Sequence, residues 1–254
     1  MKVVIIGSGN VATVIGGKIA AAGHTILQVV ARRQEAADAL GREWGAEAVA
    51  EWEAVRRDAD LYIVSVSDRA IAGLPAVLQL PGRLVVHTAG AVPLKALAGV
   101  SARCGVLYPL QSIRKEIRPF PEFPLLIDAE NAADLALLET FALSIARQVQ
   151  RADDVYRLKC HAAAVLVNNF GNFLYTLADD FCNREKIDFG LLQPIIRETG
   201  ARLERYPPRA VQTGPAIRGD AGTMQRHLEL LAGYPQLSAL YELFSAQIAA
   251  YFRN

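Results

Sequence analysis

The chain has 254 residues, which is enough for two domains or for one domain with a large extension. Hydrophobic residues make up 52% of it and charged residues 21%, as is normal for a soluble α/β protein with a sizeable core. The formal net charge of +1 provides no overall attraction to nucleic acid or to an anionic membrane, so we predict neither as a partner.

Cysteine usage and the N-terminus indicate a reducing compartment. Cys104, Cys160 and Cys182 are widely spaced and form neither a CxxC metal pair nor a disulfide framework, so we expect free thiols and no metal. The apolar stretch at the N-terminus spans only residues 3–6, which is too short for a signal peptide, and no other run is long enough to span a bilayer. A cytoplasmic location is therefore expected.

The first half of the chain alternates short β-branched runs with helical patterns, as parallel βαβ units do. Continuous apolar runs such as residues 3–6 are typical of strands that are buried on both faces. The predicted helices lie at 11–22, 34–44 and 131–147. The predicted strands lie at 3–6, 26–31, 61–66, 84–87 and 104–107, with late edge strands at 124–127 and 148–150.

The strand pattern stops after residue 152. Asp153 and Asp154 suit a helix start, and the helix that follows reaches about residue 183 and is hydrophobic nearly all round, so we expect it to be buried. Further helices are predicted at 188–205, 220–231 and 237–252. The sequence thus predicts an α/β Rossmann domain with a mostly parallel sheet over 1–152, followed by an all-α substrate and dimerisation domain over 153–254.

A dinucleotide fingerprint follows the first predicted strand. Residues 7–12 read GxGxxA, in which Gly7 permits a tight turn, Gly9 admits a pyrophosphate, and Ala12 allows the helix to pack closely on the strand. The helix N-terminus adds free N–H groups and a positive dipole end. A glycine-rich turn without a ligand is the alternative, but the expected βαβ context is present. We therefore predict that the cofactor contacts the turn and the helix start, namely Gly7, Ser8, Gly9, Asn10 and Val11.

The end of the second strand indicates which cofactor binds. An NAD site usually carries an acid there, which would repel a 2′-phosphate. This chain has Arg32 and Arg33 instead, with no acid before Glu35, and guanidinium groups suit a phosphate. Two solvated arginines at a helix start are the alternative. The sequence favours NADP as the cofactor.

Ligands of open α/β sheets bind beyond the carboxyl ends of the strands. Small and hydroxyl residues follow two further strands, so Val66, Ser67, Thr88 and Ala89 are predicted to line the cofactor. A third segment, 108–112, lies at another strand end. His87 either points into the crevice as a proton donor or packs in the core.

The long helix carries polar residues on one side, where His161 and Asn168 are seven positions apart. Either these two face the nicotinamide and substrate, or they belong to a polar seam at a helix or subunit interface. In the loop over 213–220, Arg218 could bind a substrate carboxylate or a partner subunit, and Asp220 could cap the helix that bears His227.

These motifs together resemble a known group. The fingerprint, the strand ends at 87–90 and 109–112, the helix carrying His161 and Asn168, and the loop over 214–220 are similar to Rossmann-like NADP oxidoreductases with a C-terminal helical domain of unknown function. More distantly the chain is similar to pyrroline-5-carboxylate reductases, deazaflavin-dependent NADP reductases and 3-hydroxyacid dehydrogenases. The resemblance implies a helical domain like that of 6-phosphogluconate dehydrogenase-like proteins, and a homodimer built through it.

The chain departs from its relatives in two places. Ala164 and Val165 stand where 3-hydroxyacid dehydrogenases carry a catalytic lysine, and Tyr108 stands where the group often has histidine.

The leading hypothesis is an NADP(H)-dependent oxidoreductase that acts on a small carbonyl or imine substrate, with His161 or His87 as proton donor. Asn168 would hold the substrate and Arg218 a carboxylate. The alternative, which the missing lysine favours, is a non-catalytic NADP(H)-binding sensor or scaffold.

Overall fold

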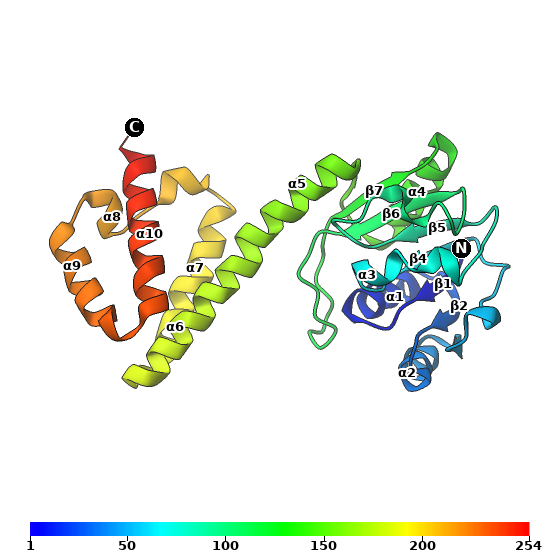
Figure 1. Ribbon diagram of the computed structural model, residues 1–254, viewed down its shortest axis with the longest axis horizontal. Coiled ribbons are helices and arrows are strands. Elements are labelled where there is room, and N and C mark those ends of the chain that lie inside the picture. Colours follow the sequence, from blue (N-terminus) through cyan, green and yellow to red (C-terminus); the bar gives the residue numbers. More distant parts are fainter. Residues whose placement is uncertain (254) are drawn as a thin grey trace. The chain divides into compact units, whose positions relative to one another are not determined.

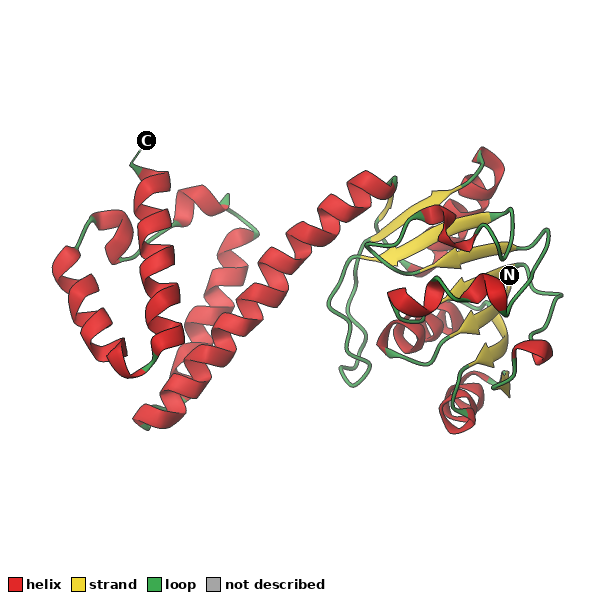
Figure 2. Cartoon of the chain, in the orientation of Figure 1, coloured by secondary structure: helices red, strands yellow, loops and turns green. Residues whose placement is uncertain are grey.

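The computed structural model describes residues 1–253, and these form two compact units, residues 1–170 and the helical remainder from Gly171. Each unit has its own set of elements (Figures 1 and 2). No helix within the described residues is both long and apolar enough to cross a membrane.

The first unit is built on one eight-stranded sheet in the order β3-β2-β1-β4-β5-β6-β7-β8. All neighbouring strands pair in parallel except β6 and β7, which are antiparallel. The strands are β1 Lys2–Ile6, β2 Thr25–Val30, β3 Glu47–Val49, β4 Leu61–Val64, β5 Leu84–His87, β6 Cys104–Pro109, β7 Leu125–Ala129 and β8 Val149–Arg151. The predicted Rossmann class is confirmed, although β3 was not predicted and β7 lies inside the sheet, so that only β8 of the two late strands is an edge strand.

Helices cover both faces of the sheet, and the apolar strand residues form a core cluster on each side. The α helices of this unit are α1 Asn10–Ala21, α2 Gln34–Trp44, α3 Asp68–Ile71, α4 Ala132–Ile145 and α5 Asp154–Ala164; the short 3₁₀ turns are η1 Trp52–Ala54, η2 Leu74–Ala76 and η3 Leu94–Leu97. The strand order reverses direction between β1 and β4. Such a switch point leaves a crevice at the carboxyl ends of these strands, where ligands of open α/β sheets bind.

The first unit ends later than the predicted boundary at residue 152. The strands do end at Arg151, and Asp153 caps α5 as expected, because its carboxylate accepts a hydrogen bond from Tyr156 N–H at 2.7 Å. Nevertheless α5 belongs to the first unit, since the buried side chain of Arg157 and the carboxylate of Asp154 bind the chain beyond β5. The compact unit therefore continues to Phe170.

The long helix differs from its prediction in two ways. Residues Val165–Phe170 form a π-helical segment, η4, which holds an extra residue per turn and so rotates the following side chains away from a regular 3.6-residue stripe. The expectation that this helix is buried is wrong: Leu166 is 62% exposed and Val167 is 81% exposed.

The second unit is entirely helical. Its elements are α6 Gly171–Glu185, η5 Phe189–Leu192, α7 Gln193–Leu203, η6 Pro208–Val211, α8 Pro215–Arg218, α9 Ala221–Leu230, η7 Leu231–Gly233 and α10 Pro235–Phe252. Asp220 caps α9 by accepting a hydrogen bond from Thr223 N–H at 3.0 Å, as predicted. His227 of α9 lies 2.8 Å from the Tyr241 hydroxyl of α10, which ties these two helices together.

Candidate functional site

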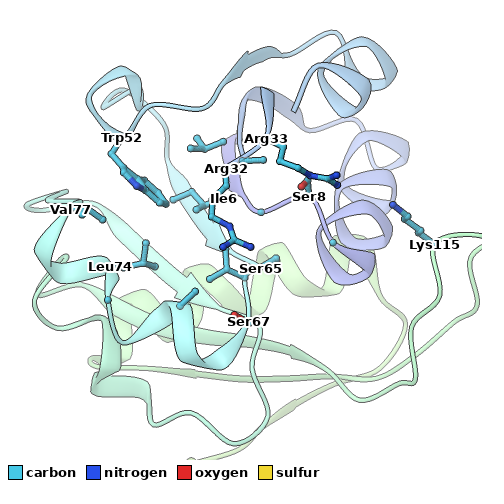
Figure 3. A pocket seen from close by; sticks show the side chains of 17 residues that line it. Ile6, Ser8, Arg32, Arg33, Trp52, Ser65, Ser67, Leu74, Val77 and Lys115 are labelled. Atoms are coloured by element: carbon cyan, nitrogen blue, oxygen red, sulfur yellow. The ribbon is translucent and has the colours of Figure 1, made fainter. Parts of the chain in front are cut away.

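A cavity of about 890 Å³ opens at the switch point, where β1 and β4 end (Figure 3). Its volume lies within the range of about 300–1,000 Å³ that is usual for small-molecule and cofactor sites. The lining includes the turn after β1, the end of β2, the segment after β4, and one lysine from the segment between β6 and β7. These residues are Ile6, Gly7, Ser8, Gly9, Val30, Ala31, Arg32, Arg33, Trp52, Ser65, Val66, Ser67, Ala70, Gly73, Leu74, Val77 and Lys115.

The turn after β1 has the geometry that a dinucleotide requires. Gly7 has a φ of +129°, and a Cβ at this position would lie 2.2 Å from the Ser65 carbonyl oxygen, so no other residue fits. Gly9 is the N-cap of α1 and makes no side-chain hydrogen bond to the first turn; a Cβ on it would meet nothing within 4 Å. The first N–H groups of α1 therefore remain available to an anionic ligand. Ala12 is completely buried, which allows α1 to pack closely on the sheet.

Positive charge gathers on one side of this cavity. Arg32 and Arg33 are exposed and follow β2 directly, and Lys115 reaches the same cavity from a distant segment. No acidic side chain contributes to the lining, so the site suits a cofactor with an additional phosphate. The residues present thus fit NADP in both respects that the sequence predicted, the glycine turn and the arginine pair.

The other predicted cofactor residues divide into two groups. Val66 and Ser67 line the cavity, whereas Thr88 and Ala89 are both 7% exposed and are not among its lining residues. The Thr88 hydroxyl instead donates a hydrogen bond to Ser65 Oγ at 3.2 Å, which supports the cavity wall from behind. Asn10 and Val11 begin α1 beside the lining glycines.

A second group of polar side chains, Tyr108 and His161, lies at the same carboxyl ends of the strands. Tyr108 lies near the carboxyl end of β6, and its hydroxyl lies 2.9 Å from Nδ1 of His161 on α5. The two rings meet edge to face, with their centroids 5.9 Å apart. Burial raises the pKa of the Tyr108 hydroxyl, so this group stays protonated at neutral pH. Nε2 of His161 makes no hydrogen bond within residues 1–253.

Gly90 provides the space for this Tyr108–His161 pair. A Cβ on Gly90 would lie 2.8 Å from His161 Nδ1 and 2.9 Å from Tyr108 Cζ. The glycine that ends the segment 87–90 is therefore required by a close approach of side chains. Gly90 and Tyr108 both lay in segments that the sequence analysis identified at strand ends, but neither was assigned a role there.

His87 has a different environment from the one that catalysis needs. It is completely buried at the end of β5, its Nδ1 accepts a hydrogen bond from Ala89 N–H at 3.2 Å, and its Nε2 has no partner among the described residues. Burial, followed by the positive charge of Arg157, lowers the pKa of His87 from 6.5 to about 4. Of the two possibilities left open for His87, the structure favours packing in the core, so that His161 remains as the predicted proton donor.

Arg157 and Asp154 hold α5 on the chain beyond β5. The Arg157 guanidinium is 1% exposed and donates hydrogen bonds of 2.6 Å to the Val92 carbonyl and to Asp154 Oδ1. Asp154 Oδ1 also accepts a bond from Leu94 N–H at 2.9 Å. This clamp lies one helical turn before His161, and so it fixes the helix that presents the imidazole.

The remaining predicted residues lie apart from these groups. Asn168 is exposed in the π-helical segment, which is a type of segment often found at functional sites. Arg218 is exposed at the end of α8 in the second unit. The roles of Asn168 and Arg218 stay predictions.

No cluster of three or more metal-ligating side chains occurs in the described part of the chain.

Two family models match the chain. Residues 2–90 match the family described as NADP oxidoreductase, coenzyme F420-dependent, and residues 123–248 match the domain of unknown function DUF2520. No curated protein sequence matches it.

Solved structures resemble the whole chain. BF3122 of Bacteroides fragilis, a candidate NADP oxidoreductase, is 36% identical over 98% of both chains, with a TM-score of 0.90. A reductive aminase from Aspergillus terreus, in complex with NADPH and ethyl-5-oxohexanoate, is 18% identical over 97% of this chain and 94% of its own, with a TM-score of 0.67. An imine reductase from Streptomyces aurantiacus is 16% identical over 98% and 96%, also with a TM-score of 0.67. The last two likenesses concern the fold alone.

Proposed function

We propose that this chain, which belongs to the family of NADP oxidoreductases with a C-terminal DUF2520 domain, reduces or oxidises a small carbonyl or imine compound by hydride transfer. The observation that carries the proposal is the Tyr108–His161 pair, which stands at the same sheet edge as the dinucleotide cavity. Unlike the similar His227–Tyr241 pair, which joins two helices of the second unit, this pair stands at the carboxyl ends of the sheet strands, where ligands of such sheets bind. When bound, NADPH supplies the hydride.

The chain's own residues hold the cofactor and supply the proton. The glycine turn and the N–H groups of α1 would bind the pyrophosphate, and Arg32 and Arg33 the 2′-phosphate. In the imidazolium form of His161, Nδ1–H donates to the Tyr108 oxygen and leaves Nε2–H for the substrate. As the carbonyl or imine carbon receives the hydride, Nε2 gives its proton to the substrate oxygen or nitrogen, and the neutral imidazole keeps its proton on Nδ1.

Two structural neighbours support this class of substrate. The structures of the Aspergillus terreus reductive aminase contain NADPH with a keto ester, or cyclohexanone with allyl amine, and the Streptomyces aurantiacus protein is an imine reductase. Asn168 and Arg218 are the further candidates for substrate contact. We propose Arg218 for substrates that carry a carboxylate, because a guanidinium binds this group through two parallel hydrogen bonds.

The test is a screen of NADPH oxidation with keto acids, aldehydes, ketones and preformed imines, each measured with the wild-type chain and with His161→Ala. Turnover that depends on His161 supports the proposed activity. Cofactor binding without turnover of any compound would contradict the proposed activity and would favour a non-catalytic sensor. The absence of a lysine at Ala164 and Val165 is compatible with that alternative.

Arg32 and Arg33 give a prediction about cofactor choice. Replacing both with Ala removes two charge-assisted contacts to the 2′-phosphate, each worth about 1.5–3 kcal/mol, so the affinity for NADP⁺ should fall about 100-fold or more. The affinity for NAD⁺ should change little. The measurement is calorimetric titration with both cofactors, with Arg56→Ala/Arg57→Ala as the control because this arginine pair lies outside the cavity. An unchanged NADP⁺-to-NAD⁺ ratio would contradict the assignment.

We also propose that the chain is a homodimer built through its helical part. Most of its exposed large apolar side chains lie beyond residue 154, among them Val167, Phe170, Leu191, Ile195 and Tyr251. Apolar surface of this extent is typical of a protein interface. Sedimentation velocity should give about twice the 27.5 kDa mass of one chain, whereas a monomer at micromolar concentration would contradict the proposal.

A further inference from the structure

The segment between β6 and β7, residues 110–124, is anchored on α1. The Phe120 ring packs so closely on Gly17 that a Cβ there would lie 2.6 Å from it. Lys18 of α1 forms an ion pair of 2.9 Å with Glu122, and the amine of Lys18 also lies 5.0 Å from the centre of the Phe123 ring. The second half of the segment is thus fixed to the helix whose N-terminus borders the cavity.

The same segment is tied to α2. The Arg118 guanidinium stacks on the Phe120 ring at 3.9 Å from its centre and forms an ion pair of 3.2 Å with Glu43. Since α2 begins directly after Arg33, the segment contacts both helices that start at the cavity. Its first half, which includes Lys115, is thereby held beside the glycine turn.

Lys115 lines the cavity together with Arg32 and Arg33, and in Figure 3 its amine points toward Arg33 and Ser8. Within residues 1–253, none of these three cations forms an ion pair. By contrast, Arg114 and Arg118 on the same segment are paired with Glu116 and Glu43. Like charges that share a cavity repel one another, and a bound anionic ligand would replace this repulsion with attraction.

We propose that Lys115 is a third cationic ligand of the dinucleotide and binds one of its phosphate groups alongside the arginines. This inference rests on the proposed function, because it takes NADP(H) as the occupant of the cavity. The pyrophosphate and the 2′-phosphate offer the same chemistry to an ammonium group. The comparison of two cofactors distinguishes them.

The experiment measures dissociation constants for NADP⁺ and NAD⁺ by calorimetric titration at low and at physiological salt. Lys115→Ala should weaken binding about fivefold to tenfold, as expected for one partly solvated ion pair worth about 1 kcal/mol, and the difference should shrink as salt is added. Lys115→Arg should stay close to the wild type because it keeps the charge. Arg114→Ala is the matched control, since it removes a neighbouring charge that does not line the cavity. Lys115 is exposed, so none of these variants should affect folding.

Each outcome has a definite meaning. An equal loss for both cofactors assigns Lys115 to the pyrophosphate, and a loss for NADP⁺ alone assigns it to the 2′-phosphate. If Lys115→Ala binds both cofactors as tightly as the wild type does, the role of Lys115 is overturned but the proposed function stays intact. A wild-type chain that binds neither cofactor overturns both.

Discussion

Replacing His161 with Ala should lower NADPH-dependent turnover by about 10²–10⁴-fold, which is the usual contribution of a positioned general acid. The affinity for NADP⁺ should stay within about twofold, because His161 does not line the dinucleotide cavity. The measurement combines steady-state kinetics on the best substrate from the screen with calorimetric titration of the cofactor. Unchanged turnover would remove His161 from the mechanism.

His24 provides the matched control for this substitution. It lies just before β2, at the edge of the sheet opposite to the cavity, where its ring contacts the N-terminal amine at 3.0 Å and the Ser144 hydroxyl at 2.7 Å. His24→Ala should therefore leave turnover unchanged, although it removes an imidazole from the same unit. A similar loss in both variants would indicate general damage to the fold instead of a catalytic role.

Tyr108→Phe separates positioning from proton transfer. The variant keeps the aromatic contact with His161 but removes the hydroxyl that lies 2.9 Å from Nδ1. One hydrogen bond is worth about 1 kcal/mol, so turnover should fall by about fivefold to tenfold, much less than for His161→Ala. This hierarchy follows if His161 gives the proton and Tyr108 only orients the ring.

The sheet and the dinucleotide turn were predictable because each rests on local signals. Buried parallel strands appear as continuous apolar runs, and the predicted strand at 84–87 matches β5 residue for residue. The predicted helix at 34–44 likewise matches α2. The GxGxxA turn specifies its own backbone, since Gly7 needs a positive φ and leaves no room for a Cβ. The short strand β3 was missed because Glu47–Val49 offers only three residues, too few for any periodic pattern.

The rest of the site depends on contacts between distant residues. Tyr108 and His161 are 53 positions apart, and Lys115 reaches the cavity only because Phe120, Arg118 and Glu122 anchor its segment. No local pattern encodes such contacts. The stripe assigned to His161 and Asn168 assumed 3.6 residues per turn, which the π-helical segment after Ala164 does not obey. The apolar character of that helix predicted burial, but its side chains at Leu166 and Val167 are exposed, because hydrophobicity alone does not specify what packs against a helix.

His87 carries the second large prediction, which concerns stability and not turnover. The ordinary pKa of a solvated histidine side chain, as in the unfolded chain, is 6.5, and in the folded chain the pKa of His87 is lowered to about 4. The chief cause is burial, which disfavours the imidazolium, and the second is repulsion by Arg157. Between pH 6.5 and 4 the unfolded chain therefore binds a proton that the folded chain does not. Stability must fall as the pH is lowered through this window.

The expected loss from His87 is about 2 kcal/mol between pH 7 and 5, and about 3 kcal/mol when the pH reaches 4. It is measured as the free energy of unfolding by urea at a series of pH values. His87→Asn is the informative variant, because its side-chain oxygen can still accept the Ala89 N–H bond while the titrating ring is gone. Its stability at pH 7 should be lower than that of the wild type, owing to the smaller side chain, but its decline toward pH 5 should be shallower by about 2 kcal/mol.

Arg157→Met tests the second cause of the same shift. This substitution preserves most of the buried stem but removes the charge that repels the His87 imidazolium, so the acid-induced loss should shrink relative to the wild type. His24, whose pKa is also lowered by burial, stays in all of these variants, and its contribution therefore cancels in each comparison. Equal pH slopes for the wild type and His87→Asn would show that His87 is not held neutral in the core. It would then be available again as a proton donor, and the assignment of that role to His161 alone would lose its structural basis.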